Sequence, residues 1–163
     1  MTRLSDFVGS TAQAQLFTSS GPFTPVTNVI YVTGCGAGGG GGTGGDVSSS
    51  GADSGGGAGG AAGAGGKRIP MKVTPGVELD VVIGVGGAGA TPATNADGNT
   101  GSDGGYSAVA LDSGAIDPAA DVVFAGGKGG KGGSITTPYT GGVGGSGGPY
   151  SAAGGDGGTQ NNP

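Results

Sequence analysis

Residues 28–45 read NVIYVTGCGAGGGGGTGG, and they decide the fold because a strand pattern passes directly into glycine. The residues of 29–33 are β-branched or aromatic, which is typical of a short buried strand. The following glycines recur at every third position, at Gly36, Gly39, Gly42 and Gly45. Three residues per turn is the repeat of the extended polyproline II helix. We therefore predict a junction at which a strand becomes a polyproline II helix, with Cys35 buried at the seam.

The same spacing returns in later glycine blocks of the chain. Glycines three residues apart stand at Gly57, Gly60, Gly63 and Gly66, and again at Gly98, Gly101 and Gly104. The last blocks, 126–133, 141–148 and 154–158, are built from glycine doublets. A polyproline II helix has no internal hydrogen bonds, so its buried N–H and C=O groups need neighbouring chains. Several blocks in one chain predict a packed bundle, whereas a single block would be a flexible tether.

Short strand patterns separate the glycine blocks. Two strands are expected in 17–33 around a turn at 20–22, with Phe17, Phe23, Val29 and Tyr31 on one side. Apolar residues alternate through 69–83, and Thr74-Pro75-Gly76 fits a type II turn, so this segment predicts a β-hairpin. Further strands are expected at 106–111 and 122–125.

The expected fold is therefore mostly β and irregular. It consists of a small antiparallel β-sandwich with packed glycine-rich polyproline II helices and no significant α-helix, since no segment has helical periodicity with caps. Residues 1–16 form an N-terminal docking or tail segment, and residues 17–163 form one glycine-rich domain.

Composition excludes several classes of function. The chain has 163 residues, of which 46 are glycine, and its net charge is −5. It has no basic cluster beyond Lys67, Arg68 and Lys72, so no nucleic-acid partner is expected. It has no histidine and a single cysteine, which removes the commonest general base and any intrachain disulfide. No stretch of the chain is apolar over enough residues to predict membrane insertion. We expect no enzymatic activity, no cofactor and no bound metal.

Two glycine motifs have the letters of a dinucleotide-binding loop, at 34–39 and 84–89. Such a loop opens a helix whose N-terminus holds the pyrophosphate. Neither motif is followed by a helix-forming sequence, and residues 90–101 have the composition of a loop. The motifs therefore do not predict nucleotide binding.

Polar loops between the glycine blocks are the candidate contact regions, at 46–54, 91–103, 113–121 and 134–140. The second contains Asp97, Asn99 and Asp103, which carry oxygen ligands in a glycine-rich segment. Calcium could bind there, but the spacing departs from the EF-hand loop, and a solvated loop is the favoured interpretation. Tyr139 and Tyr150 are the candidate binding aromatics, since aromatic anchors are favoured in interfaces. The alternative is that both rings only cover the bundle.

The order of the elements resembles a known family. The segments FTSSGPFTPVTNVIYVTGCGAGGGGG, KVTPGVELDVVIGVGGAG, GGYSAVAL and VVFAGGKGG follow one another over residues 16–158. This order is similar to the glycine-rich domain found in bacteriophage tail fibres and related virion proteins. A looser analogy is with tail-fibre-tip adhesins of T-even-like phages, whose glycine-rich helices display variable loops.

This resemblance implies a virion protein made in the host cytoplasm, as a tail-fibre or tail-tip component that displays loops for receptor binding. The expected receptor-contact residues are Asp97, Asn99, Asp103, Tyr139 and Tyr150. Expected partners are other virion proteins, bound through the N-terminal segment, and a bacterial surface glycan or outer-membrane protein. A homo-oligomer, specifically a trimer, is also expected. The alternatives are a decoration protein of capsid or tail without a receptor role, and an ice-binding or elastic glycine-rich protein.

Overall fold

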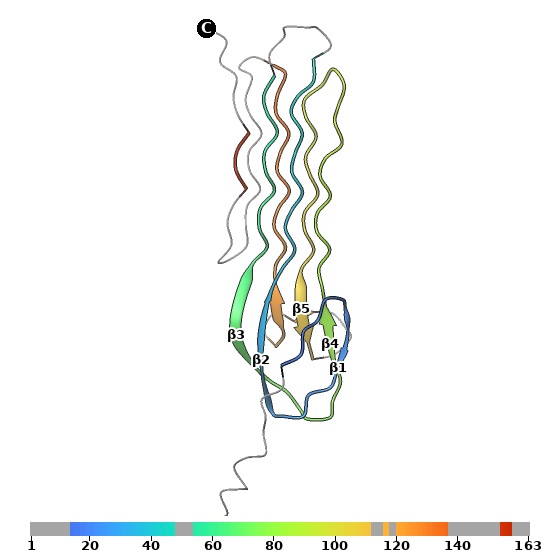
Figure 1. Ribbon diagram of the computed structural model, residues 1–163, viewed down its shortest axis with the longest axis vertical. Coiled ribbons are helices and arrows are strands. Elements are labelled where there is room, and N and C mark those ends of the chain that lie inside the picture. The colour runs from blue at the N-terminus through green and yellow to red at the C-terminus, as the bar shows by residue number, and fades with distance from the viewer. Residues whose placement is uncertain (1–13, 48–53, 112–115, 118–119, 137–153, 158–163) are drawn as a thin grey trace, which may run out of the picture.

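The protein is an elongated molecule with a β-sandwich at one end and extended glycine-rich runs rising from it (Figure 1). The computed structural model describes residues 14–47, 54–111, 116–117, 120–136 and 154–157. Its six strands are β1 (Gly21–Phe23), β2 (Val29–Cys35), β3 (Gly65–Lys72), β4 (Leu79–Val82), β5 (Ser107–Ala110) and β6 (Val122–Phe124). No helix occurs in the described part of the chain, as the sequence predicts.

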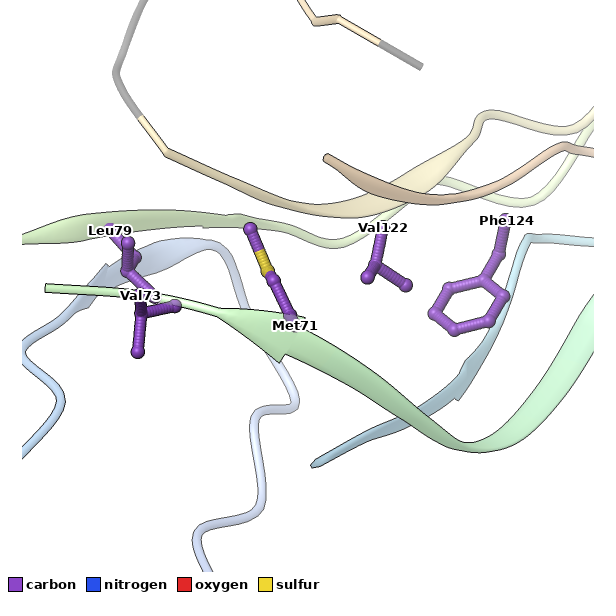
Figure 2. Close-up of a cluster of buried hydrophobic side chains, with 5 residues drawn as sticks. All are labelled: Met71, Val73, Leu79, Val122 and Phe124. Atoms are coloured by element: carbon purple, nitrogen blue, oxygen red, sulfur yellow. The ribbon is translucent and has the colours of Figure 1, made fainter. Parts of the chain in front are cut away.

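The strands form two antiparallel sheets that pack face to face. One sheet has the order β1-β4-β5-β6, and the other consists of β2 and β3. Their inner faces enclose a core of Met71, Val73, Leu79, Val122 and Phe124 (Figure 2). This arrangement confirms the predicted small antiparallel sandwich.

The predicted hairpin at 69–83 is wrong in its pairing but correct in its turn. Gly76 has a φ of 78°, and the Val77 N–H donates to the Thr74 carbonyl at 3.2 Å, as a type II turn requires. However, β3 pairs with β2, whereas β4 pairs with β1 and β5. The turn therefore carries the chain from one sheet to the other. Alternation identifies the buried face of each strand, but it does not identify the partner strand.

The turn predicted near the N-terminus is also corrected. The expected turn at 20–22 is wrong, because Gly21 and Pro22 lie in β1 opposite Val81 and Asp80. The strands of this region are instead joined by residues 24–28.

The inward face of β2 is the opposite of the one expected. Ile30 and Val32 pack against the core, while Val29 and Tyr31 face outward and Cys35 is an exposed free thiol. Val29–Val32 are all apolar, so the sequence alone does not define which alternate set is buried. The prediction that Cys35 is buried is therefore wrong, because this end of β2 turns its side chain to the outer face.

Five glycine-rich runs continue from the sandwich strands and lie side by side (Figure 1). They are run A (36–46) after β2, run B (54–64) before β3, run C (84–90) after β4, run D (96–105) before β5 and run E (125–134) after β6. Because every run joins a strand at its near end, the sandwich sets their order and direction.

Run A is the centre of the bundle and bonds to four neighbours. One set of its N–H groups donates to run B at 2.8–3.0 Å, from Gly36, Gly39, Gly42 and Gly45. The next residues along donate to run D at 2.8–3.0 Å, from Ala37, Gly40, Thr43 and Asp46. Its carbonyls accept from runs C and E. Each set repeats every three residues, which is the polyproline II period predicted from the glycine spacing.

Glycine is required here by close approach of backbones. A Cβ at Gly40 would overlap the Ala88 carbonyl of run C, and one at Gly101 would overlap the Gly40 carbonyl. Gly76 is the one glycine with a left-handed φ among those the structure describes, so backbone conformation is not the reason elsewhere. The runs are spaced too closely for side chains at these positions.

The doublets of run E follow from its position between three runs. A Cβ at Gly129 would overlap the Gly101 carbonyl of run D, and one at Gly130 would overlap the Ala58 carbonyl of run B. The third residue of each turn faces outward, as the exposed side chains of Lys128 and Lys131 show. Two of the three residues in each turn of run E therefore lie against a neighbouring backbone and are glycine, which gives the pattern Gly-Gly-x.

Candidate functional site

The end of the bundle far from the sandwich is the candidate functional site (Figure 1). Asp46 at the end of run A forms an isolated bridge with Ala96 at the start of run D. The Asp46 carboxylate also accepts the Asn95 N–H at 3.4 Å, and Asn95 has a φ of 54°. Asparagine tolerates this left-handed conformation better than most residues. These bonds fix one end of the connection between runs C and D.

The connection between runs C and D is shorter than the loop predicted at 91–103. Residues 96–105 belong to run D, and their hydrogen bonds to runs A and E make them part of the bundle. The exposed loop is therefore 91–95. Polar residues suggested a longer loop, but a run at the surface of the bundle also carries polar side chains on its solvent-facing column.

Asn99 is anchored on both its backbone and its side chain. Its N–H donates to Thr43 Oγ1 at 2.9 Å, and its Nδ2 donates to the Thr91 carbonyl at 2.9 Å. The side chain therefore ties the first residue of the 91–95 loop to run D. In this structure Asn99 positions the loop, and the receptor contact expected from the sequence stays a prediction.

Asp97 joins run D to the chain beyond run E. Its Oδ1 accepts the Ile135 N–H at 2.7 Å and the Ser134 hydroxyl at 3.1 Å. The carboxylate thus fixes the point at which the chain leaves run E at the distal end. Asp97 therefore lies in the predicted contact region, and its carboxylate fixes the backbone of that region.

Asp103 lies nearer the sandwich and binds run E. Its Oδ2 accepts from Lys128 Nζ at 2.6 Å, and its Oδ1 accepts the Gly129 N–H at 2.9 Å. Asp97 and Asp103 are two turns apart on an extended run, or about 19 Å at 3.1 Å per residue. One cation does not bridge such a distance, and the described residues contain no cluster of three metal-binding side chains.

The hydrogen bond from Lys128, with that from Gly129, lowers the pKa of Asp103 below its ordinary value. A lowered carboxylate pKa stabilises the fold above the unfolded-state value, near pH 4, and this contribution is lost as pH falls through the folded-state pKa. We therefore expect Asp103→Asn to lose less stability than wild type between about pH 5 and about pH 2. Urea unfolding over this range measures the difference.

Lys128→Gln is the matched control for this experiment, because it removes the charged partner and keeps the Gly129 N–H bond. Its loss of stability at low pH should lie between those of wild type and Asp103→Asn. Equal pH slopes for wild type and Asp103→Asn would show that this carboxylate does not contribute.

A shallow groove of about 480 Å³ lies beside this ion pair, at the junction of bundle and sandwich. Tyr106 and Ile116 line it, and Val123 and Ala125 supply further apolar surface. The half-exposed ring of Tyr106 is not among the aromatics selected from the sequence. The sequence could have indicated Tyr106 as a candidate, because it directly follows the last glycine of run D and precedes the buried strand β5.

Tyr139 and Tyr150 lie outside the described residues, as do parts of three predicted loops, 48–53, 113–115 with 118–119, and 137–140. Of the predicted contact residues, the structure therefore places Asp97, Asn99 and Asp103. It brings Asp97 and Asn99 to the distal end and leaves Asp103 nearer the sandwich. Among the described residues no helix is long and apolar enough to cross a membrane.

A β-sandwich whose strands continue into a hydrogen-bonded polyproline II bundle defines a glycine-rich module. The chain belongs to the glycine-rich domain family, whose model matches residues 18–163. No curated protein and no solved structure matches it.

Proposed function

We propose that the protein is a structural component of a bacteriophage virion, in the tail fibre or tail tip, which displays loops for binding to the host surface. The single observation that carries this proposal is that the two ends of the molecule differ. The 91–95 loop and the ends of runs A and E lie together at one end, and the sandwich lies at the other (Figure 1).

The N-terminal end of the described chain belongs to the sandwich end. The Phe17 ring packs edge to face against Phe23 of β1, with centroids 5.9 Å apart and an angle of 77° between the rings. An N-terminal segment that docks on the particle would therefore point the distal loops away from it. This orientation suits contact with a glycan or protein of the bacterial surface.

The bundle also suits a support for loops that change in sequence. Run A is fixed by hydrogen bonds between backbone atoms to four neighbouring runs. Substitutions in 91–95 therefore leave the bonds within the bundle in place. A dense network of this kind favours a rigid support over an elastic chain. Charged residues in the outward column of run E also make a poor ice-binding face.

The test is a phage carrying Gly-Ser residues in place of 91–95, with Asn99 retained. We expect adsorption to host cells to fall about tenfold or more, the effect of losing an anchor worth about 1.4 kcal/mol. Val85→Ser is the matched control, since Val85 is 81% exposed on the side of run C, away from the loop.

Equal adsorption by the two phages, with normal incorporation of the protein, would reject the receptor role. The decoration role would then be favoured, in which the same module covers the capsid or tail. Reduced adsorption by the Val85→Ser control as well would indicate a general loss of particle integrity.

A further inference from the structure

The two sheets of the sandwich carry charges of opposite sign on their strands. Strand β3 bears Lys67, Arg68 and Lys72, all exposed, and neither β2 nor β3 contains Asp or Glu. The four strands of the other sheet contain no Lys or Arg. Their acidic residue is Asp80 of β4, and the exposed Glu78 stands just before this strand.

These charges lie on the outer faces of the sandwich, which point in opposite directions. Leu79 and Val81 are buried, so alternation along β4 turns Asp80 outward. Lys72 lies opposite Val29 in the register of β2 and β3, while the neighbouring pair of Met71 and Ile30 packs at the core. One end of the molecule therefore has a cationic side and an acidic side at the same level of its long axis.

The cationic side has a specific local structure. The register shifts between Val32 and Gly34, and Arg68 takes a φ of 55°. Its N–H donates to Thr33 Oγ1 at 3.0 Å, and its guanidinium lies 5.3 Å from the centre of the Tyr31 ring. A left-handed non-glycine residue is uncommon, and such outliers point to a use of the side chain.

Tyr31 is 62% exposed beside this guanidinium, and Val29 is also exposed. Aromatic and arginine side chains are the commonest anchors of protein interfaces. The edge of β3 is interrupted by Pro70 and by the bulge at Arg68, two devices that oppose pairing with an added strand. A partner is therefore expected on the face of this sheet and not along its β3 edge.

We propose that this face, formed by Val29, Tyr31, Lys67, Arg68 and Lys72, binds a second copy of the chain at Glu78 and Asp80. The partner is argued from charge, since the complementary carboxylates lie on the opposite side of the same sandwich. A contact between two different surfaces of identical chains is heterologous, and because these two faces point in opposite directions it favours an open row of copies over a closed ring. Because both surfaces are at the sandwich level, the bundles of all copies would lie side by side. The proposal does not depend on the proposed function.

The test measures the mass of the purified full chain in solution at low and high salt, by light scattering. A single chain has a mass of 14.7 kDa, and we expect a larger average mass at low salt that falls as salt rises. The basic-face variant is Lys67→Gln with Lys72→Gln, and the acidic-face variant is Glu78→Gln with Asp80→Asn. Each should weaken association about tenfold or more.

Mixing the two variants distinguishes this contact from other forms of self-association. Each variant retains one intact face, so the mixture should form one-to-one dimers and no larger assembly. Lys131→Gln, which removes one positive charge from run E, is the control and should associate like wild type. Circular dichroism checks that every variant is folded. A monomeric wild type at low salt, or variants that associate like wild type, would overturn the proposal.

Discussion

Replacement of Gly40 by alanine should destabilise the protein by about 3–5 kcal/mol. The added Cβ would overlap the Ala88 carbonyl, so runs A and C must separate. Overpacking of this kind costs about 1–3 kcal/mol, and each backbone hydrogen bond lost costs about 1 kcal/mol. The bonds at risk include those from Gly87 to Gly38 and from Ala90 to Gly41, both 2.9 Å. Thermal unfolding should show a decrease in Tm of about 10 °C.

Gly86→Ala is the matched control for this substitution. Gly86 lies on run C beside Gly87, but a Cβ built on it meets nothing within 4 Å. Its φ is not left-handed, so alanine should be neutral or should stabilise the protein by up to about 1 kcal/mol. Similar changes in Tm for Gly40→Ala and Gly86→Ala would contradict the close packing of runs A and C.

The second large effect is expected for Phe124→Ala, at about 3–5 kcal/mol. Phe124 is 4% exposed at the end of β6, where the core of the sandwich meets the bundle. Its ring occupies the space beside two glycines, since a Cβ at Gly34 would lie 2.9 Å from Cε2 and one at Gly66 would lie 2.8 Å from Cε1. Removing the ring leaves a cavity at this junction. Urea unfolding followed by circular dichroism measures the loss.

Phe124→Leu separates the loss of volume from the loss of the aromatic ring. Leucine fills part of the space, so a smaller destabilisation than for alanine is expected. A Phe124→Ala protein as stable as wild type would show that the sandwich core does not extend to this junction.

The glycine spacing predicted much of the bundle, because three-residue periodicity is a local property. Gly36, Gly39 and Gly42 already carry the period, and their N–H groups do bond at every turn to run B. The type II turn at Gly76 was also predictable, because proline and glycine restrict the backbone locally.

Features that depend on distant partners were not predictable in the same way. Ile69–Val73 and Val77–Ile83 have the same alternation whether they pair with one another or lie in opposite sheets. The prediction of which side of β2 faces outward was wrong for the same reason, because apolar residues occupy both sides of this strand. Asp97 and Asp103 looked like loop residues, but their partners lie more than twenty residues away on the chain at Ile135 and Lys128.

The most direct test of the bundle is amide hydrogen exchange along run A, followed residue by residue by NMR. The N–H groups of Gly36, Ala37, Gly39, Gly40, Gly42 and Thr43 donate to runs B and D. No backbone acceptor is found among the described residues for those of Gly38, Gly41 and Gly44. We predict two protected amides followed by one that exchanges faster, repeated along the run. Rapid and uniform exchange from Gly36 to Gly45 would contradict the hydrogen-bonded bundle.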